Sequence, residues 1–159
     1  MKSYILRGKE LATKPYHYTQ CGLDDVYLMN GYHVHETPYG NGVSVEKADE
    51  LQHAIAMSLC ENKAFLSGTE FRFLRKLMNL TQAEVASYFL CNVQAVARWE
   101  KGKTELNGAA DRLLRLLYIG SRRANVSPEE VIKALAELDA KADSQQIFEE
   151  TADGWKTAA

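Results

Sequence analysis

The sequence has few cysteines and no long apolar run. Its three cysteines are odd in number and far apart, at Cys21, Cys60 and Cys91, which is typical of reduced thiols and argues against a disulfide framework. No apolar run is long enough for a transmembrane helix. The first residues, MKSYILRGKE, contain only a short apolar stretch, too short for the core of a secretory signal. We therefore expect a cytoplasmic protein with no membrane association.

The sequence also lacks the short motifs of common enzymes. It contains no Gly-x-Ser-x-Gly, no phosphate-binding loop and no His-Glu-x-x-His. The adjacent Asp24 and Asp25 are typical of a turn. We predict no catalytic residues, no cofactor and no enzymatic activity.

Four N-terminal residues raise the question of a metal site: His17, Cys21, His33 and His35. His33 and His35 would share one face of a strand, as two zinc ligands could. The spacing of the four matches no zinc motif. We favour the alternative, in which histidines and tyrosines cover a small hairpin, and predict no metal ligands. A metal-dependent enzyme built on these histidines is the least favoured hypothesis.

Charge is unevenly distributed along the 159 residues, although the net charge is only −2. Residues 67–123 hold ten basic and five acidic side chains, a net charge of +5. Residues 1–66 have a net charge of −2 and residues 124–159 a net charge of −5. A basic middle between acidic ends favours contact with a polyanion. The alternative is ordinary variation of a solvated surface.

The N-terminal third has the pattern of strands and turns. VYLM and YHVH flank Asn30-Gly31, and Asn-Gly between two β-rich runs predicts a hairpin with a type I′ turn. Turn-forming residues continue in TPYGNG at 37–42. An apolar stripe then predicts a helix from about Ser44 to residues 61–63.

The middle of the chain has the pattern of consecutive capped helices. Ser67 with Glu70 and Thr81 with Glu84 form capping-box pairs, and the other predicted N-caps are Asn92, Asn107 and Ser127. After Lys141 the apolar period fades. The last residues are expected to form a mobile tail, or to dock through Phe148 and Trp155.

These patterns predict a mostly α-helical fold with a small β portion. We expect an N-terminal β-hairpin plus helix at 1–63, which dimerises or binds a partner, and a helical domain of four to five helices at 64–123. An extra helix at 124–142 and an acidic flexible tail at 143–159 would follow.

LTQAEVASYFLCNVQAVARWEKG, residues 80–102, contains two capped helices with a very short turn between them. This arrangement is typical of a helix-turn-helix, in which the second helix enters the major groove and the first braces it. We therefore expect residues 64–123 to be a helix-turn-helix DNA-binding domain. The residues expected in the seam between the helices are Ala83, Val85, Ala86, Phe89, Val96 and Trp99.

LTQAEVA followed by VQAVARWEKGK resembles the helix-turn-helix of the Cro and phage-repressor (XRE) family, over roughly residues 67–118. That family usually has glycine at the turn where this chain has Leu90. Leu90 therefore either adopts a positive φ, at a cost of about 1 kcal/mol or more, or the turn has another shape.

VQAVARWEKGK also resembles the DNA-binding half of MqsA-type antitoxins. Their zinc-binding Cys-x-x-Cys pairs are absent here.

The predicted DNA-binding residues lie on and around the two helices. Gln94 and Arg98 would read base edges, and Gln82, Asn92, Lys101 and Lys103 would contact the backbone. Val93 and Ala97 would also face the DNA. Glu100 is expected to pair within the domain.

We predict a sequence-specific regulator, a repressor that binds an inverted repeat in double-stranded DNA as a homodimer. The alternative is an antitoxin-like protein that neutralises a partner such as a toxin and autoregulates its operon.

Overall fold

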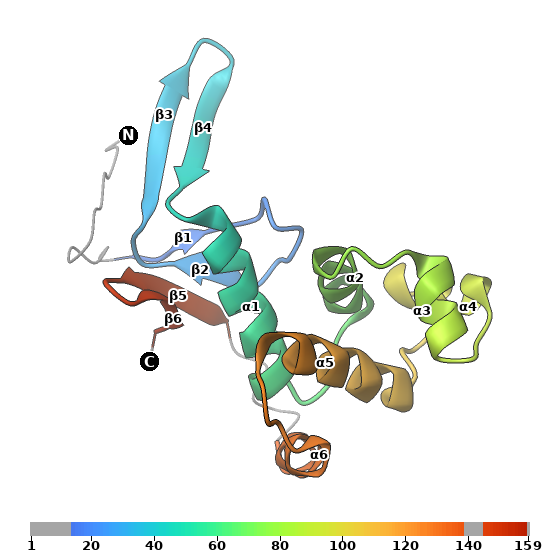
Figure 1. Cartoon of the computed structure of the whole chain (residues 1–159). Coiled ribbons are helices and arrows are strands. Elements are labelled where there is room, and N and C mark those ends of the chain that lie inside the picture. The colour runs from blue at the N-terminus through green and yellow to red at the C-terminus, as the bar shows by residue number, and fades with distance from the viewer. Residues whose placement is uncertain (1–13, 139–144, 159) are drawn as a thin grey trace. The chain divides into compact units, whose positions relative to one another are not determined.

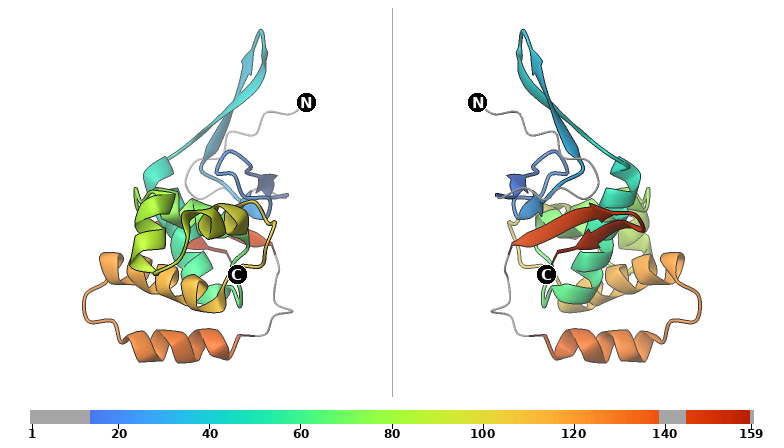
Figure 2. Two further views of the ribbon diagram at one scale, coloured as in Figure 1. Left: turned by 90° about the vertical axis from the view of Figure 1, so that its right-hand side faces the viewer. Right: turned by 90° about the vertical axis from the view of Figure 1, so that its left-hand side faces the viewer.

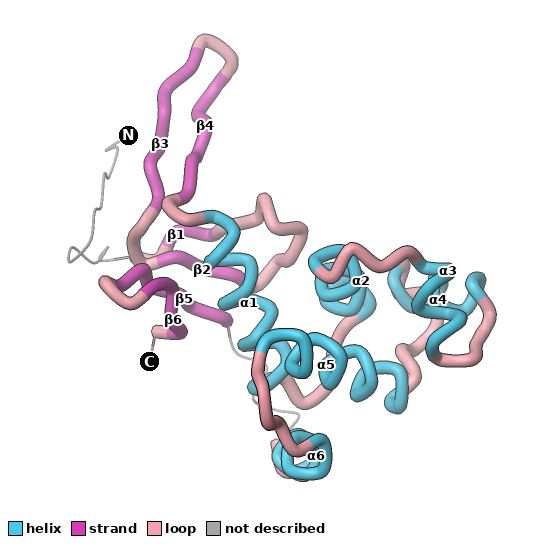
Figure 3. Tube along the Cα trace, viewed as in Figure 1, coloured by secondary structure: helices cyan, strands magenta, loops and turns pink. Residues whose placement is uncertain are grey.

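The computed structural model describes residues 14–138 and 145–158. Its contacts divide the chain into two compact units. The first, here called the sheet unit, comprises residues 1–55 and 144–159, and the second, the helical unit, comprises residues 56–143. Figure 3 shows that the strands of the described residues all belong to the sheet unit. The mixture of a helix-turn-helix portion with a small hairpin and sheet confirms the predicted fold class.

Strands from both ends of the chain form one four-stranded sheet, in the order β1-β2-β5-β6. These strands are β1 (Tyr16–His17), β2 (Val26–Leu28), β5 (Gln146–Thr151) and β6 (Gly154–Thr157). β2 and β5 are parallel, with Leu28 opposite Phe148, whereas the two outer pairs are antiparallel. Val26, Leu28 and Phe148 are fully buried, so these apolar side chains form the core of the sheet unit.

This pairing corrects the expectation of a flexible tail at 143–159, of which residues 145–158 are described. Phe148 is fully buried and Trp155 is 8% exposed. The indole N–H of Trp155 donates to the carbonyl oxygen of Glu46 at 2.9 Å. The alternative expectation, docking through Phe148 and Trp155, is what the structure shows. Residues 145–158 contain too few apolar side chains to show a hydrophobic period in the sequence. Buried side chains of the neighbouring strand β2, Val26 and Leu28, supply much of the core instead.

The hairpin is present, but the predicted turn at Asn30-Gly31 was wrong. β3 (Tyr32–Thr37) pairs with β4 (Gly40–Val45), so Pro38 and Tyr39 form the turn. Figure 1 shows this hairpin projecting from the four-stranded sheet.

Asn30 and Gly31 support the sheet instead of turning a hairpin. The Asn30 side chain donates to the carbonyl oxygen of Glu150 at 3.0 Å and accepts from the N–H of Glu150 at 2.6 Å. Gly31 has φ +74°, and a Cβ there would lie 2.6 Å from the Trp155 ring. Asparagine suits position 30 because its amide can both donate to and accept from the backbone of Glu150. Glycine suits position 31 because it has no Cβ to collide with the Trp155 ring.

Helix α1 (Ala48–Asn62) contributes its first turns to the sheet unit and its last turns to the helical unit. It begins later than the predicted Ser44, because Ser44 and Val45 belong to β4, where Val45 lies opposite Tyr32. Its end agrees with the prediction. No helix among residues 14–138 and 145–158 has the length and apolar character of a membrane span.

The described part of the helical unit, residues 56–138, contains five further helices: α2 (Gly68–Leu77), α3 (Gln82–Tyr88), α4 (Val93–Glu100), α5 (Gly108–Arg122) and α6 (Pro128–Ala136). α6 is seen end-on in Figure 1 and lengthwise in Figure 2, so it crosses α5. All the predicted N-caps are confirmed, at Ser67, Thr81, Asn92, Asn107 and Ser127. Part of the predicted extra helix, residues 139–142, lies outside the described residues.

Candidate nucleic-acid interface

α3 and α4 are joined by a turn so short that only Phe89 to Asn92 separate them. Val85, Ala86 and Val96 are buried between the helices and their neighbours, as predicted. Trp99 packs edge-to-face on Phe71 of α2, with ring centroids 6.1 Å apart. Ala83 was expected in this seam but is exposed. It lies two residues before Val85 and so faces nearly the opposite side of α3 from that buried side chain.

Leu90 in this turn adopts the first of the two predicted alternatives. Its φ is +53°, in the left-handed region that costs a residue with a Cβ about 1 kcal/mol or more. Its side chain is 94% exposed, so little packing offsets that cost. The helix-turn-helix therefore keeps the backbone path of a glycine turn without the glycine.

A buried carboxylate links α2, α3 and α4. Glu100 is 9% exposed and Arg75 is 8% exposed. Arg75 donates to both Glu100 oxygens, through Nε to Oε1 at 2.5 Å and Nη2 to Oε2 at 3.2 Å. Nη1 of Arg75 also donates to the carbonyl oxygen of Leu80 at 2.8 Å. Gln82 Nε2 donates to Glu100 Oε2 at 2.5 Å. Glu100 thus pairs within the domain, and its charge is matched where burial makes an unpaired carboxylate costly.

α2 and α4 touch through their backbones. A Cβ on Gly68, the first residue of α2, would lie 1.8 Å from the carbonyl oxygen of Trp99. Only glycine allows this approach. The contact holds the end of α4 against the start of α2.

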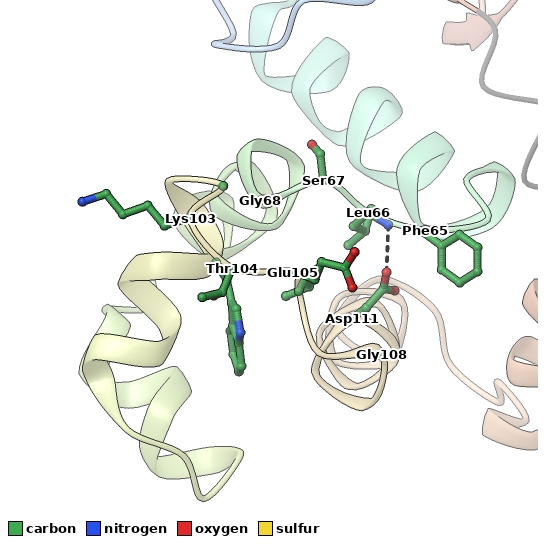
Figure 4. Close-up of a pocket in the computed structure, with 12 residues that line it drawn as sticks. Phe65, Leu66, Ser67, Gly68, Lys103, Thr104, Glu105, Gly108 and Asp111 are labelled. Atoms are coloured by element: carbon green, nitrogen blue, oxygen red, sulfur yellow. Dashed lines mark hydrogen bonds between the residues drawn. The ribbon is translucent and has the colours of Figure 1, made fainter.

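Figure 4 shows the pocket beside this contact, where the start of α2, the loop after α4 and the start of α5 meet. Within it the N–H of Leu66 donates to Asp111 Oδ2 at 2.8 Å. Asp111 also pairs with the fully buried Arg115, Nε to Oδ1 at 2.7 Å. Arg115 in turn donates to the carbonyl oxygens of Lys63 and Ala64. This network fixes the segment before α2 on α5.

The structure places the predicted DNA-binding residues on α3, on α4 and in the segments next to α4. Gln82 and Ala97 are half-buried, and the others are exposed. The exposed residues are Asn92, Val93, Gln94, Arg98, Lys101 and Lys103.

Gln94 and Arg98 are one turn apart on α4 and so share a face. Asn92 caps α4 by accepting the Gln94 N–H at 2.8 Å. Lys103 extends away from the pocket in Figure 4. The predicted DNA-binding residues from Asn92 to Lys103 therefore lie on α4 and directly beside it. Gln82 differs from them, because it lies on α3 and its side chain donates to Glu100.

The N-terminal histidines are engaged within the sheet unit. His17 bonds to the carbonyl oxygen of Asp24 at 2.6 Å and stacks on Tyr27. His33 lies 2.7 Å from Glu46 Oε1, and His35 lies 2.9 Å from Ser44 Oγ. Among residues 14–138 and 145–158, no three His, Cys, Asp or Glu side chains are grouped to hold a metal ion.

Two residues that hold the helix-turn-helix together, Arg75 and Gly68, were not predicted as important. Arg75 and Gly68 have no local motif that marks them, because each acts on a residue more than twenty positions away. Glu100 was expected to pair within the domain, but its two partners were not identified. A glycine at the first position of a helix, where small polar or proline residues are common, was the one available signal for Gly68.

Comparison with known proteins agrees with this geometry. Residues 71–110 match the model of a helix-turn-helix family. No curated protein and no solved structure matches the chain. The narrower resemblance to MqsA-type antitoxins is therefore not confirmed.

The matched segment runs from Phe71 in α2 to Ala110 in α5 and includes both helices of the helix-turn-helix. The family is one of DNA-binding domains rather than of enzymes. Residues 71–110 therefore carry a helix-turn-helix of the XRE type, a kind of domain found in DNA-binding transcription regulators.

Proposed function

We propose that this protein is a sequence-specific repressor that binds an inverted repeat as a homodimer, with α4 in the major groove. The main supporting observation is the exposed face of α4, where Gln94 and Arg98 lie one turn apart on a helix braced by α3. Glutamine can pair with adenine and arginine with guanine in that groove. Val93 can contact a thymine methyl group.

Four residues beside this face are proposed to contact phosphates: Gln82, Asn92, Lys101 and Lys103. Such contacts position the domain and supply affinity for any sequence. Residues 67–123 have a net charge of +5, which favours a polyanion. One helix spans only a few base pairs, so two-fold symmetry is the usual way to extend the site.

Selection of binding sites from a randomised duplex library tests this proposal. We expect one enriched motif with two-fold symmetry and a spacing near one helical turn. Affinity for it should fall steeply with salt, with a slope of about −0.9 per phosphate neutralised. No enrichment together with a flat salt titration would argue against DNA as the ligand. An enriched motif without two-fold symmetry would argue against the homodimer but not against sequence-specific DNA binding.

An antitoxin-like role is the second candidate, and the charge of the sheet unit favours it. The described residues of that unit hold nine acidic and three basic side chains. Such a surface is unsuited to DNA and suits a basic protein partner. Co-purification of the full chain with the product of a neighbouring gene, and relief of that product's toxicity, would support this role.

A further inference from the structure

We propose that Glu100 is a positioning residue for DNA binding: fixed by Arg75, it holds the Gln82 amide in the orientation that donates a hydrogen bond to a DNA phosphate. This inference rests on the proposed DNA-binding function and assigns a part in it to two buried residues. Neither Glu100 nor Arg75 needs to touch the DNA.

The orientation of the Gln82 amide follows from the chemistry of its partner. A paired carboxylate only accepts hydrogen bonds. The amide group that faces Glu100 Oε2 at 2.5 Å must therefore be the –NH₂ and not the carbonyl. One of its two hydrogens is used by Glu100, and the second is then fixed in the amide plane.

Glu100 can impose this orientation because it is itself held. Arg75 binds both of its oxygens, and the planar guanidinium fixes the plane of the carboxylate. The same guanidinium is tied to the turn between α2 and α3 through the carbonyl oxygen of Leu80. Burial of both side chains, at 9% and 8% exposure, limits alternative rotamers.

Gln82 extends from this buried pair to the surface. It is the first residue of α3, directly after the exposed cap Thr81, and it is half-buried. Its second N–H is the group that can reach a phosphate beside the major groove. A donor held in one orientation before binding loses less side-chain entropy when the contact forms.

The charge of Glu100 makes the inference sharply testable. By simple electrostatics, removing a carboxylate from a DNA-binding domain should tighten binding. Positioning predicts the opposite for Glu100→Gln, because a neutral amide can present either its oxygen or its –NH₂ to Gln82.

A double-mutant cycle on DNA affinity tests the inference in the full chain. The variants are Gln82→Ala, Glu100→Gln and both together, each measured on a library-selected duplex and on a scrambled duplex of equal length. We expect Gln82→Ala to weaken both complexes about ten-fold with an unchanged salt slope, because a neutral donor displaces no counterion. Glu100→Gln should weaken both similarly, and the double variant should bind no worse than Gln82→Ala alone.

Glu70→Gln is the matched control. Glu70 is also a buried carboxylate of the helical unit, 5% exposed and 3.2 Å from Lys63 Nζ, but it does not contact Gln82. Glu70→Gln should bind both duplexes as tightly as the unaltered chain or slightly more tightly, as the loss of a carboxylate alone predicts. Should Glu100→Gln fail to fold, Arg75→Lys replaces it in the cycle, because lysine keeps the charge without the planar two-point contact.

Several outcomes would overturn the inference while leaving DNA binding in place. They are tighter binding by Glu100→Gln, losses that multiply in the double variant, no loss in Gln82→Ala, and a reduced ratio of selected to scrambled affinity. The last would show that Glu100 acts by placing α4. Failure of the unaltered chain to bind any duplex would overturn the proposed function and this inference together.

Discussion

Gly68 lies directly against the backbone of Trp99: a Cβ built on Gly68 would be 1.8 Å from the Trp99 carbonyl oxygen and 2.8 Å from its carbonyl carbon. Gly68→Ala must therefore push α2 away from α4. We expect the free energy of unfolding to fall by about 2 kcal/mol or more, as in overpacked cores, when measured by chemical denaturation.

Gly108→Ala is the control for this substitution. Gly108 also begins a helix, α5, but a Cβ there meets nothing within 4 Å. Alanine should be neutral or slightly stabilising at that position. Equal effects of the two substitutions would contradict a specific contact between Gly68 and Trp99.

Leu90→Gly should stabilise the protein by about 1 kcal/mol, because glycine adopts the φ of +53° without strain. The 94% exposure of Leu90 means that little packing is lost. Thermal denaturation of the two proteins measures the difference. Asn79→Gly is the comparison, since Asn79 also has a positive φ, of 57°, but asparagine tolerates that region. A lower melting temperature for Leu90→Gly would show that the leucine side chain makes a contact worth more than the strain.

The C-terminal strands should be essential for the sheet unit. Trp155→Ala removes a ring that packs on Gly31 and donates to the Glu46 carbonyl. We expect a loss of about 3 to 5 kcal/mol, as for other buried aromatic residues, in denaturation experiments. Lys156→Ala should have little effect, because its side chain is 56% exposed. Unchanged stability of Trp155→Ala would restore the expectation of a dispensable tail.

Gln94 and Arg98 should determine sequence preference, whereas Lys101 should supply affinity for any sequence. Arg98→Ala is expected to cost about 1 to 3 kcal/mol on the selected site and much less on scrambled DNA. Gln94→Ala should relax the preference at one base pair, an A·T pair. Lys101→Ala should weaken all duplexes alike and make the salt slope shallower by about one.

These three variants are measured on selected, singly substituted and scrambled duplexes at two salt concentrations. An unchanged ratio of selected to scrambled affinity in Arg98→Ala and Gln94→Ala would show that α4 does not read bases.

Alkaline pH should destabilise the fold through two buried groups. Burial raises the pKa of the Cys60 thiol from 9.0 to about 12, and burial likewise raises the pKa of Tyr118 from 10.0 to about 12. Both groups stay protonated in the native state while the unfolded state ionises. Their stabilisation is therefore complete below pH 9 and is lost as the pH rises towards 12.

Denaturation midpoints measured from about pH 8 to pH 11 test this linkage. Cys60→Ala and Cys60→Ser both lack the thiol, and both should show a shallower decline despite different absolute stabilities. Tyr118→Phe should do the same at higher pH. A decline identical to that of the unaltered chain would assign the effect to other groups.

The sequence was most informative where structure is local. Each helix start in the middle of the chain was predicted correctly, because a cap such as Ser67 and its partner Glu70 are only three residues apart. The turn at Leu90 was confined to two alternatives by the family resemblance, since that family usually has glycine there. The exposed face of α4 with Gln94 and Arg98 followed from helical spacing alone.

Non-local contacts were what the sequence did not reveal. Asn30-Gly31 has the local chemistry of a hairpin turn, yet Asn30 pairs with Glu150, 120 residues away. Phe148 could not be placed from local pattern because β2, the strand that pairs with its own strand, comes from the other end of the chain. The contacts of Glu100 with Arg75 and Gln82 likewise depend on how three helices pack.

The parallel pairing of β2 with β5 determines the order in which the two units can fold during translation. Val26 is synthesised before the helical unit, but its partner Gln146 follows only after all the residues of that unit, 56–143. The segments that form the helical unit are complete before then, and domains generally fold as units during translation. A chain that stops after the helical unit, at residue 143, would therefore contain the entire helix-turn-helix but lack β5 and β6, so its sheet could not be completed.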